Sequence, residues 1–376
     1  AWYENDGSES FTEHAISTSE DGAHSIYAVD VDGDGDMDVL TGSHIDDTIA
    51  WYEQEGSPVF QPQTTAELQT AVDLWVSDNA TALTTYGEIN TWDVSLITDM
   101  SSLFNGKSTF NDDIGSWDVS NVNNMGSMFV MASNFNQDLS NWVLPNVTDM
   151  NNMFRSAQSF TGDGLEHWDV SNVTNMTHLF AGATNFNGNI SSWDVSNVVN
   201  MSVLFAQAST FNADISSWDV SSVTNMVAMF ETAIAFNADI SSWNVSNVVD
   251  MGSMLKDAIS FNHPIGSWDV SGVTKMNYMF YSDMGLVFNQ DISNWNISNV
   301  FSMGAMFGGS NSLSDGNKCA IHASFQSNDA WPYDWSELCY QFETRDELVT
   351  AINLWISDNA AALSTYGPIN GWDVSL

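Results

Sequence analysis

The 376-residue sequence has very little positive charge. Six Lys and Arg stand against 48 Asp and Glu, which gives a formal net charge of −42. Nucleic acids and anionic membrane surfaces are bound through basic residues, so the composition argues against both as partners. Apolar runs long enough to span a bilayer are also absent, and we expect no membrane insertion. Such a surface suits salt water or divalent cations, which screen or coordinate carboxylates.

Cysteine is scarce as well. Cys319 and Cys339 are the two cysteines, and they form no C-x-x-C pair or zinc-ligand spacing. Free thiols would be the interpretation for a cytosolic enzyme. In an acidic, repeat-built chain of extracellular character, a local disulfide between them is favoured.

Recognisable catalytic motifs are missing too. The seven histidines are scattered without metal-ligand spacing, and there is no G-x-S-x-G, P-loop or G-x-G-x-x-G motif. The aspartates form a regular array and not the isolated pair with separated pKa values that glycoside hydrolysis needs. We therefore expect that the chain is not an enzyme.

Repetition is what the sequence has in abundance. The phrase W-[DN]-[VI]-S recurs with small variations every 25 to 27 residues, and a methionine follows each of its tryptophans eight residues later. The nine tryptophans are Trp92, Trp117, Trp142, Trp168, Trp193, Trp218, Trp243, Trp268 and Trp295. A period of this length indicates stacked units that bury a shared core, with the tryptophan, methionine and phenylalanine columns inside.

Two periodicities alternate within each unit. Trp193 and Val195 lie two apart, as on one face of a strand. Apolar residues at i, i+3, i+4 and i+7 from Met201 predict a helix of about two turns, with Asn200 as its N-cap. The predicted fold class is an α/β repeat solenoid with one short strand and one short helix per 25-residue coil.

The pattern divides the chain into five segments. Residues 1–60 follow rules of their own, and 61–90 carry a capping box and an amphipathic face typical of a helical N-terminal cap. Residues 91–309 form the nine-coil solenoid, and 310–341 the cysteine-containing C-terminal cap. Residues 342–376 repeat the first cap 280 residues later and start a second array. We therefore expect a segment of a longer, tandem protein.

The stretch AVDVDGDGDMDVLTG at 28–42 carries five alternating aspartates, Asp30, Asp32, Asp34, Asp36 and Asp38. Five carboxylates within nine residues repel one another unless a cation lies among them. A hard oxygen set in a flexible loop favours Ca²⁺ over zinc. No Glu lies at the twelfth position, so this is not an EF-hand. The alternative is a solvated acidic turn.

This loop and the W-Y-E-N strand at the start of the chain resemble the FG-GAP/VCBS class of β-propeller blade. The resemblance covers about one blade. It implies Ca²⁺ ligation by side-chain oxygens of Asp30, Asp32, Asp34 and Asp38 and by the main-chain carbonyl of Asp36. It adds an N-terminal β-propeller-type blade to the predicted fold.

The 25-residue units resemble the BspA-like repeats of bacterial surface proteins, which form solenoids akin to leucine-rich repeats. The phrases WDVSNVTNM at 168–176 and FNADIS at 211–216 carry the match, which covers roughly 90–308. This resemblance implies a secreted or surface-anchored, often adhesive protein, and it does not imply an enzyme.

Two polar columns run along the repeats. An aspartate follows the tryptophan at Asp93, Asp118, Asp169, Asp194, Asp219 and Asp269. The same position holds Val143, Asn244 and Asn296 elsewhere, and Asn keeps the acceptor without the charge. A turn or ladder hydrogen bond is therefore favoured over a ladder of bound cations. The asparagine of the F-N phrase is expected to bond the backbone of the next coil.

Eight N-x-S/T sequons occur, at Asn79, Asn146, Asn172, Asn175, Asn189, Asn200, Asn244 and Asn296. In a eukaryotic secreted chain these would be candidate glycosylation sites. Several of them fall inside the repeated phrase, so a by-product of the repeat is the favoured interpretation.

These features favour an extracellular structural or adhesive segment of a longer fibre, stalk or surface layer, with a Ca²⁺-stabilised blade. The alternative is a recognition module that binds protein or glycan on a solenoid face. It would need an exposed aromatic or Thr-rich stripe, and we expect none. Expected partners are neighbouring modules, further copies of the chain, and a surface protein or glycan.

Overall fold

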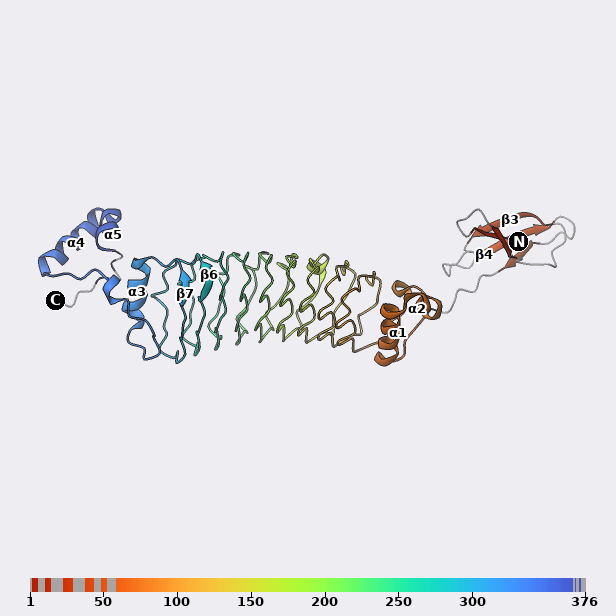
Figure 1. The fold of residues 1–376 in the computed structure, drawn as a ribbon, viewed down its shortest axis with the longest axis horizontal. Coiled ribbons are helices and arrows are strands. Elements are labelled where there is room, and N and C mark those ends of the chain that lie inside the picture. Colours follow the sequence, from red (N-terminus) through yellow and green to blue (C-terminus); the bar gives the residue numbers. More distant parts are fainter. Residues whose placement is uncertain are drawn as a thin grey trace. The chain divides into compact units, whose positions relative to one another are not determined.

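The computed structural model describes residues 2–5, 11–14, 23–29, 38–43, 49–52, 59–367, 369 and 372. The chain divides into two compact units, residues 1–60 and 61–376, and each is described by itself (Figure 1). No helix in these ranges is both long and apolar enough to cross a membrane.

The first unit is built from antiparallel strands. β1 (Trp2–Asn5) pairs with β2 (Phe11–His14). A second sheet has the order β3 (Ala23–Val29), β4 (Asp38–Ser43) and β5 (Ile49–Tyr52). Val29 pairs with Asp38. The aspartate-rich residues 30–37 therefore connect two paired strands, although they themselves lie outside the described residues.

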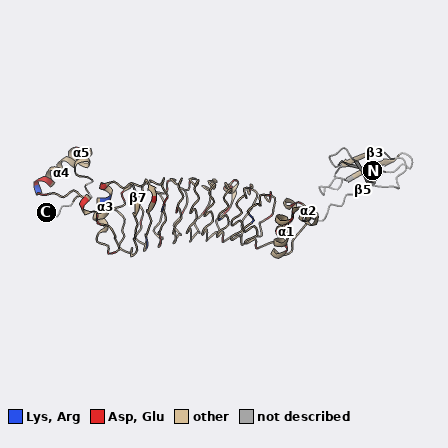
Figure 2. Cartoon of the chain, in the orientation of Figure 1, with Lys and Arg blue, Asp and Glu red and all other residues tan. Residues whose placement is uncertain are grey.

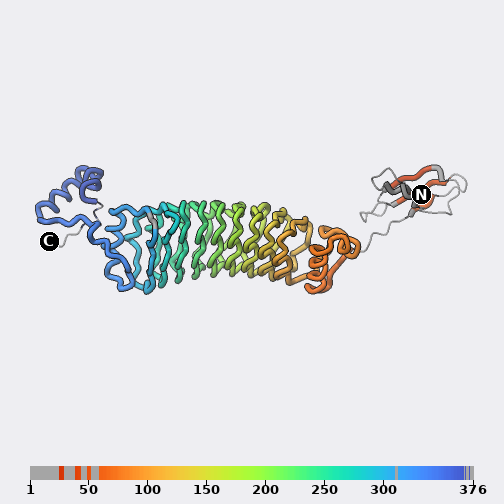
Figure 3. Tube along the Cα trace, in the orientation of Figure 1, coloured from red at the N-terminus to blue at the C-terminus, as the bar shows by residue number. Residues whose placement is uncertain are grey.

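The second unit opens with two helices and continues as a stack of coils. α1 (Thr65–Ser77) and α2 (Asn79–Tyr86) are followed by the short 3-10 turn η1 (Ile89–Thr91). Eight parallel bridges then join successive coils, from Asp99↔Asn124 to Lys275↔Ser302. The coils therefore lie one on the next, as Figures 1 and 3 show.

Three short elements interrupt the regular coils. The 3-10 turn η2 (Leu165–His167) lies where one repeat has an additional residue. β6 (Ser282–Leu286) and β7 (Gly309–Asn311) pair in parallel in the last two coils. Elsewhere in the described coils the stacking is carried by single bridges and backbone hydrogen bonds.

The helix predicted in each coil is wrong, because the described repeats contain tight turns at those positions. The N–H groups of Leu204 and Ala206 donate to the carbonyls three residues earlier, at 3.3 Å each. The N–H groups of the alternating residues Val203 and Phe205 donate instead to the next coil, at 2.8 and 2.9 Å. In the predicted helix the N–H groups of Leu204, Phe205 and Ala206 would all donate to carbonyls four residues earlier. Here alternate donors hold the neighbouring coil.

The predicted strand at Trp193–Val195 and the predicted helix cap at Asn200 are corrected in the same way. No strand is assigned at the tryptophan phrase in the described coils, and the parallel bridge falls at Asn200. Asn200 Oδ1 accepts from the N–H of Ser202 at 3.0 Å. The side chain of an asparagine accepts a hydrogen bond from the N–H two residues ahead in turns as well as at helix caps. The recurrence of Asn or Asp at this position therefore reflects a turn, and no helix follows it.

The interior prediction is confirmed. Trp193 and Trp218 are each 3% exposed and stack with ring centroids 6.4 Å apart and planes at 1°. Phe205 and Phe230 continue a parallel column at 5.7 Å, and Met201 is fully buried. Burying a side chain of this size contributes on the order of 2 kcal/mol, so each coil depends on its neighbours for stability.

Helices cover the two ends of the stack. The predicted apolar face of α1, made by Leu68, Ala71, Val72 and Trp75, is buried. At the other end lie α3 (Asp315–Phe325) and the 3-10 turn η3 (Ser336–Leu338). They are followed by α4 (Arg345–Ser357) and α5 (Asn359–Tyr366), whose bounds repeat those of α1 and α2 280 residues later.

Candidate functional site

The aspartates after the tryptophans make turns. In Asp219, Oδ1 accepts from the backbone N–H of Ser221 at 2.9 Å, and the hydroxyl and N–H of Ser221 together lower the pKa of the carboxyl. Asn244 and Asn296 accept from the equivalent N–H groups at 3.2 Å. The turn interpretation of this column is confirmed, and the carboxylate charge is not needed for it.

The F-N asparagines link one coil to the next, as predicted. The N–H of Asn212 donates to Asn187 Oδ1 at 2.8 Å, and the N–H of Asn237 donates to Asn212 Oδ1 at 2.7 Å. Thr161 replaces an asparagine and interrupts the series, so the N–H of Asn187 bonds the Thr161 carbonyl at 3.3 Å. These amides serve the backbone of the stack.

Several sequon asparagines use the nitrogen to which a glycan would attach. Nδ2 of Asn146 donates to the Ser120 carbonyl at 2.8 Å, and Nδ2 of Asn172 to the Pro145 carbonyl at 3.0 Å. Six sequon asparagines are exposed, whereas Asn175 and Asn200 are half-buried. The exposed six are Asn79, Asn146, Asn172, Asn189, Asn244 and Asn296.

A row of threonine and valine, exposed except at the half-buried Thr274, was missed from the sequence, and the expectation of no Thr-rich stripe is corrected here. The Thr/Val row consists of the residue six places after each tryptophan: Thr98, Asn123, Thr148, Thr174, Val199, Thr224, Val249, Thr274 and Phe301. Its backbone is bonded from coil to coil, with Val199 N–H to Thr174 O and Thr224 N–H to Val199 O both at 2.9 Å. Val199 and Val249 are each 45% exposed. The signal in the sequence was the recurrence of Thr at one fixed phase.

The aspartates predicted to bind Ca²⁺ lie largely beyond the described part of the chain. Asp30, Asp32, Asp34 and Asp36 are outside it, and Asp38 is described by its backbone alone, as the first residue of β4. Elsewhere in the described ranges, no three His, Cys, Asp or Glu side chains converge to hold a metal ion. The calcium site therefore stays a prediction.

All six Lys and Arg residues of the sequence lie between positions 61 and 376, in the second unit. They are Lys107, Arg155, Lys256, Lys275, Lys318 and Arg345. Figure 2 shows how few blue segments the described coils carry. Two of these lysines join coils through ion pairs, Lys256 with Glu231 at 2.7 Å and Lys275 with Asp250 at 3.0 Å. These pairs are partly exposed, so each contributes at most about 1 kcal/mol.

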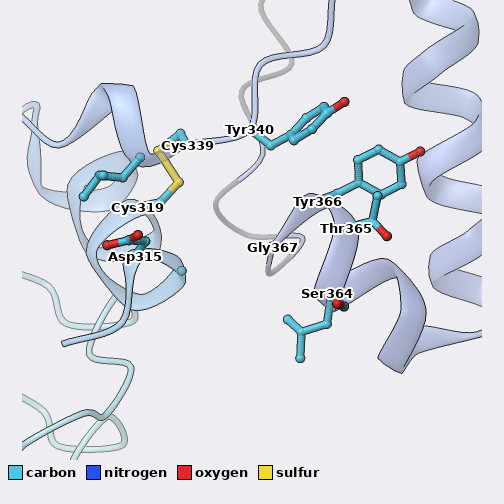
Figure 4. Close-up of a pocket in the computed structure, with 11 residues that line it drawn as sticks. Asp315, Cys319, Cys339, Tyr340, Ser364, Thr365, Tyr366 and Gly367 are labelled. Atoms are coloured by element: carbon cyan, nitrogen blue, oxygen red, sulfur yellow. A yellow bond between two sulfur atoms is a disulfide. The ribbon is translucent and has the colours of Figure 1, made fainter. Parts of the chain in front are cut away.

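The predicted disulfide is present, and it borders a cavity of about 340 Å³ (Figure 4). Cys319 and Cys339 lie on one side, and Tyr340 and Tyr366 also line it. The Tyr340 hydroxyl donates to Glu347, which raises the pKa of the phenol to about 12. The phenol is protonated at neutral pH and both cysteines are oxidised, so these groups supply no activated nucleophile.

Two family models match the chain. The model for an FG-GAP-like repeat matches residues 1–41, which include the aspartate-rich loop. Comparison with curated proteins and with solved structures gives no match. A second model matches residues 74–165, 161–241 and 217–319, which together cover more than half of the chain. The chain therefore belongs to the family described as Mycoplasma protein of unknown function, DUF285.

Proposed function

We propose that the chain is an extracellular structural or adhesive segment of a longer fibre, stalk or surface layer. The observation that carries this proposal is that every coil is joined to the next, from Asp99 to Ser302, by a parallel bridge. Each coil bonds the next through its backbone and through buried rings, as in Phe205 N–H to Met229 O at 2.9 Å. Length in such a protein is set by the number of repeats and can change without altering the core.

The finer identity that we propose is a BspA-like surface repeat of leucine-rich-repeat character with no catalytic role. The match to a repeat family over the coils supports it, as does the use of the polar columns for turns and ladders. The proposed partners are neighbouring modules, further copies of the chain, and a surface protein or glycan.

Antibody labelling tests the location. An antibody raised against the full chain should label intact cells of the source organism without permeabilisation. Labelling that requires permeabilised cells would contradict an extracellular role. An antibody to a cytoplasmic protein of the same cells serves as the control for membrane integrity.

We also propose that Ca²⁺ stabilises the first unit. Residues 1–60 carry 15 Asp and Glu and no Lys or Arg, so no side chain of that segment other than histidine offers a positive charge to the five aspartates. Oxygen donors at this density suit Ca²⁺, and the match to an FG-GAP-like repeat over residues 1–41 supports the assignment. The ion would be held by Asp30, Asp32, Asp34, Asp36 and Asp38.

Calorimetric titration of the full chain with Ca²⁺ tests this assignment. We expect the unmodified chain to bind Ca²⁺. The double change Asp32→Asn and Asp34→Asn should abolish this binding, and the matched control Asp219→Asn should leave it intact. In low salt, EDTA should lower the melting temperature of the first unit. Equal Ca²⁺ binding by both variants, or melting that EDTA leaves unchanged, would refute the calcium proposal.

A second candidate function is recognition through the Thr/Val row. Hydroxyl and methyl groups recur at one position of the stacked coils, and a face of this kind suits a periodic ligand such as a polysaccharide. A glycan array probed with the full chain should then give selective binding that Thr174→Lys and Thr224→Lys remove. Binding that survives both changes, or none at all, would leave the structural role alone.

A further inference from the structure

α4 and α5 reproduce the cap formed by α1 and α2. The N–H of Glu67 donates to Thr64 Oγ1 at 3.2 Å, and the N–H of Glu347 donates to Thr344 Oγ1 at the same distance. A glycine with positive φ ends each pair of helices, at 71° for Gly87 and 72° for Gly367. The two segments are therefore one module, present twice.

Trp372 occupies the place of Trp92, the first tryptophan of the stack. Trp92 meets Trp75 edge-on at 5.8 Å, and Trp372 meets Trp355 edge-on at 5.7 Å. The Trp92 indole N–H donates to the Gly87 carbonyl at 3.2 Å, and that of Trp372 donates to the Gly367 carbonyl at 3.0 Å. The second module thus holds its tryptophan as the first module holds the start of a coil.

The two modules differ in what covers their apolar face. In the first, coil residues lie on α1: Thr65 Oγ1 donates to the Asp99 carbonyl at 2.8 Å, and Gln69 Nε2 donates to the Leu103 carbonyl at 3.1 Å. Val72 there is fully buried.

In the second module the same face is open. Ile352, the counterpart of Val72, is 38% exposed, and Ile369, the counterpart of the 3% exposed Ile89, is 44% exposed. Val349, which replaces Gln69, is 41% exposed. The second module therefore presents, at Ile352 and Ile369, the apolar positions that are buried in the first module at Val72 and Ile89.

We propose that α4 and α5 cap a second stack, whose first coil begins at Trp372 and covers Ile352. The occupant is a 25-residue coil of the type that begins at Trp92, continuous with Trp372 in the same chain. Residues 371–376, GWDVSL, repeat residues 91–96, TWDVSL, in all but the first position. This inference holds for a protein in any compartment, so it stands or falls separately from the proposed adhesive role.

In the interface between α4 and the proposed second stack, the backbone carbonyls of the first coil would accept hydrogen bonds from different side chains than at α1. Most of the backbone hydrogen bonds between coils run from an N–H group to a carbonyl of the next coil, so the corresponding carbonyls of a first coil need donors from the cap. Arg345 and Val349 replace Thr65 and Gln69. The Arg345 guanidinium would therefore be the donor, while position 349 contributes only apolar contact.

The test is an extended chain, made of residues 1–376 followed by a copy of residues 97–341. The junction keeps the register because Leu376 corresponds to Leu96. Amide hydrogen exchange is measured on α4 in the 376-residue chain and in the extended chain. We expect exchange in α4 to slow at least about tenfold in the extended chain, towards the rates of α1.

Two variants keep the test decisive. Ile352→Asp should change α4 exchange little in the 376-residue chain and should remove the added protection in the extended chain. Val349→Gln restores a donor, so it should slow exchange further in the extended chain only. Exchange in α4 that the extension leaves unchanged, or that either variant alters equally in both chains, would overturn the proposal.

Discussion

At the scale of single residues, the tryptophan of a coil stacks on its neighbours in the column and donates a hydrogen bond to a backbone carbonyl. Trp218 is buried, stacks on Trp193 and Trp243 at 6.4 Å each, and donates its indole N–H to the Ile190 carbonyl at 3.0 Å. Phenylalanine could fill most of the space but could not make the hydrogen bond. This explains why tryptophan holds this position in all nine coils.

We expect Trp218→Phe to lower the free energy of unfolding by about 3 kcal/mol, because a buried carbonyl loses its donor and the smaller ring leaves a cavity. Urea denaturation followed by circular dichroism measures the loss. The control is Trp51→Phe, because Trp51 is 46% exposed and its replacement should cost less than about 0.5 kcal/mol. Equal effects of the two changes would argue against the buried column.

The turn-forming aspartates predict a pH dependence of known sign. Hydrogen bonds from Ser221 lower the pKa of Asp219 in the folded state. A lowered folded-state pKa gives stability that is present above the unfolded pKa of about 3.9 and is lost as pH falls through the folded value. The stack should therefore lose stability in acid below about pH 4.

Asp219→Asn keeps the acceptor and removes the titration. Its stability at pH 7 should match that of the unmodified chain, and its loss between about pH 4 and pH 2 should be smaller. Asp219→Ala removes the acceptor and should cost about 0.5 kcal/mol or slightly more at pH 7. Thermal melts across this pH range measure both, and identical acid profiles for all three proteins would contradict the turn assignment.

At the scale of the coil, the apolar positions could be predicted from the sequence but the backbone path could not. The spacing from Met201 correctly identified inward-facing residues, and both a helix and a series of turns satisfy that spacing. Fourteen described non-glycine residues have positive φ, including Val203 at 61° and Thr232 at 60°. Left-handed positions are normally signalled by Gly or Asn, so these two gave no warning.

Hydrogen bonds between coils offset the backbone strain at these positions. A left-handed non-glycine residue costs roughly 1–2 kcal/mol, and the N–H of Val203 bonds the next coil at 2.8 Å. Such contacts connect residues about one repeat apart. A periodicity read over the length of one helix does not include them. The same separation explains why the Thr/Val row was missed although each of its residues was visible.

The N-terminal cap gives a prediction at the scale of the element. Thr65→Val removes the hydroxyl that donates to the Asp99 carbonyl of the first coil, and we expect a loss of about 1 kcal/mol. Thr70→Val on the same helix is the matched control, because the Thr70 hydroxyl bonds Ala66 within α1 at 2.8 Å and is exposed. Hydrogen exchange in the first coil should accelerate in the Thr65 variant alone. Acceleration in both would show that the helix itself was weakened.

At the scale of the whole chain, the stack depends on equivalent residues of successive repeats lying next to one another. The sequence was sufficient for the order of the tryptophans, the turn role of Asp219 and the asparagine ladder through Asn212. It also pointed to the Cys319–Cys339 disulfide. What it could not supply was the direction of the backbone donors, which depends on contacts between coils and determines what each cap must provide.

The central claim is that successive coils lie directly on one another. Pulsed electron-electron resonance between spin labels on cysteines introduced at Asp118, Asp219 and Asp269 tests it, with the native cysteines kept oxidised. Asp118 and Asp219 lie four coils apart and Asp118 and Asp269 six, so the account predicts narrow distances of roughly 20 Å and 30 Å, an increment of about 5 Å per coil. Broad distributions, or distances that do not grow with the number of intervening coils, would contradict it.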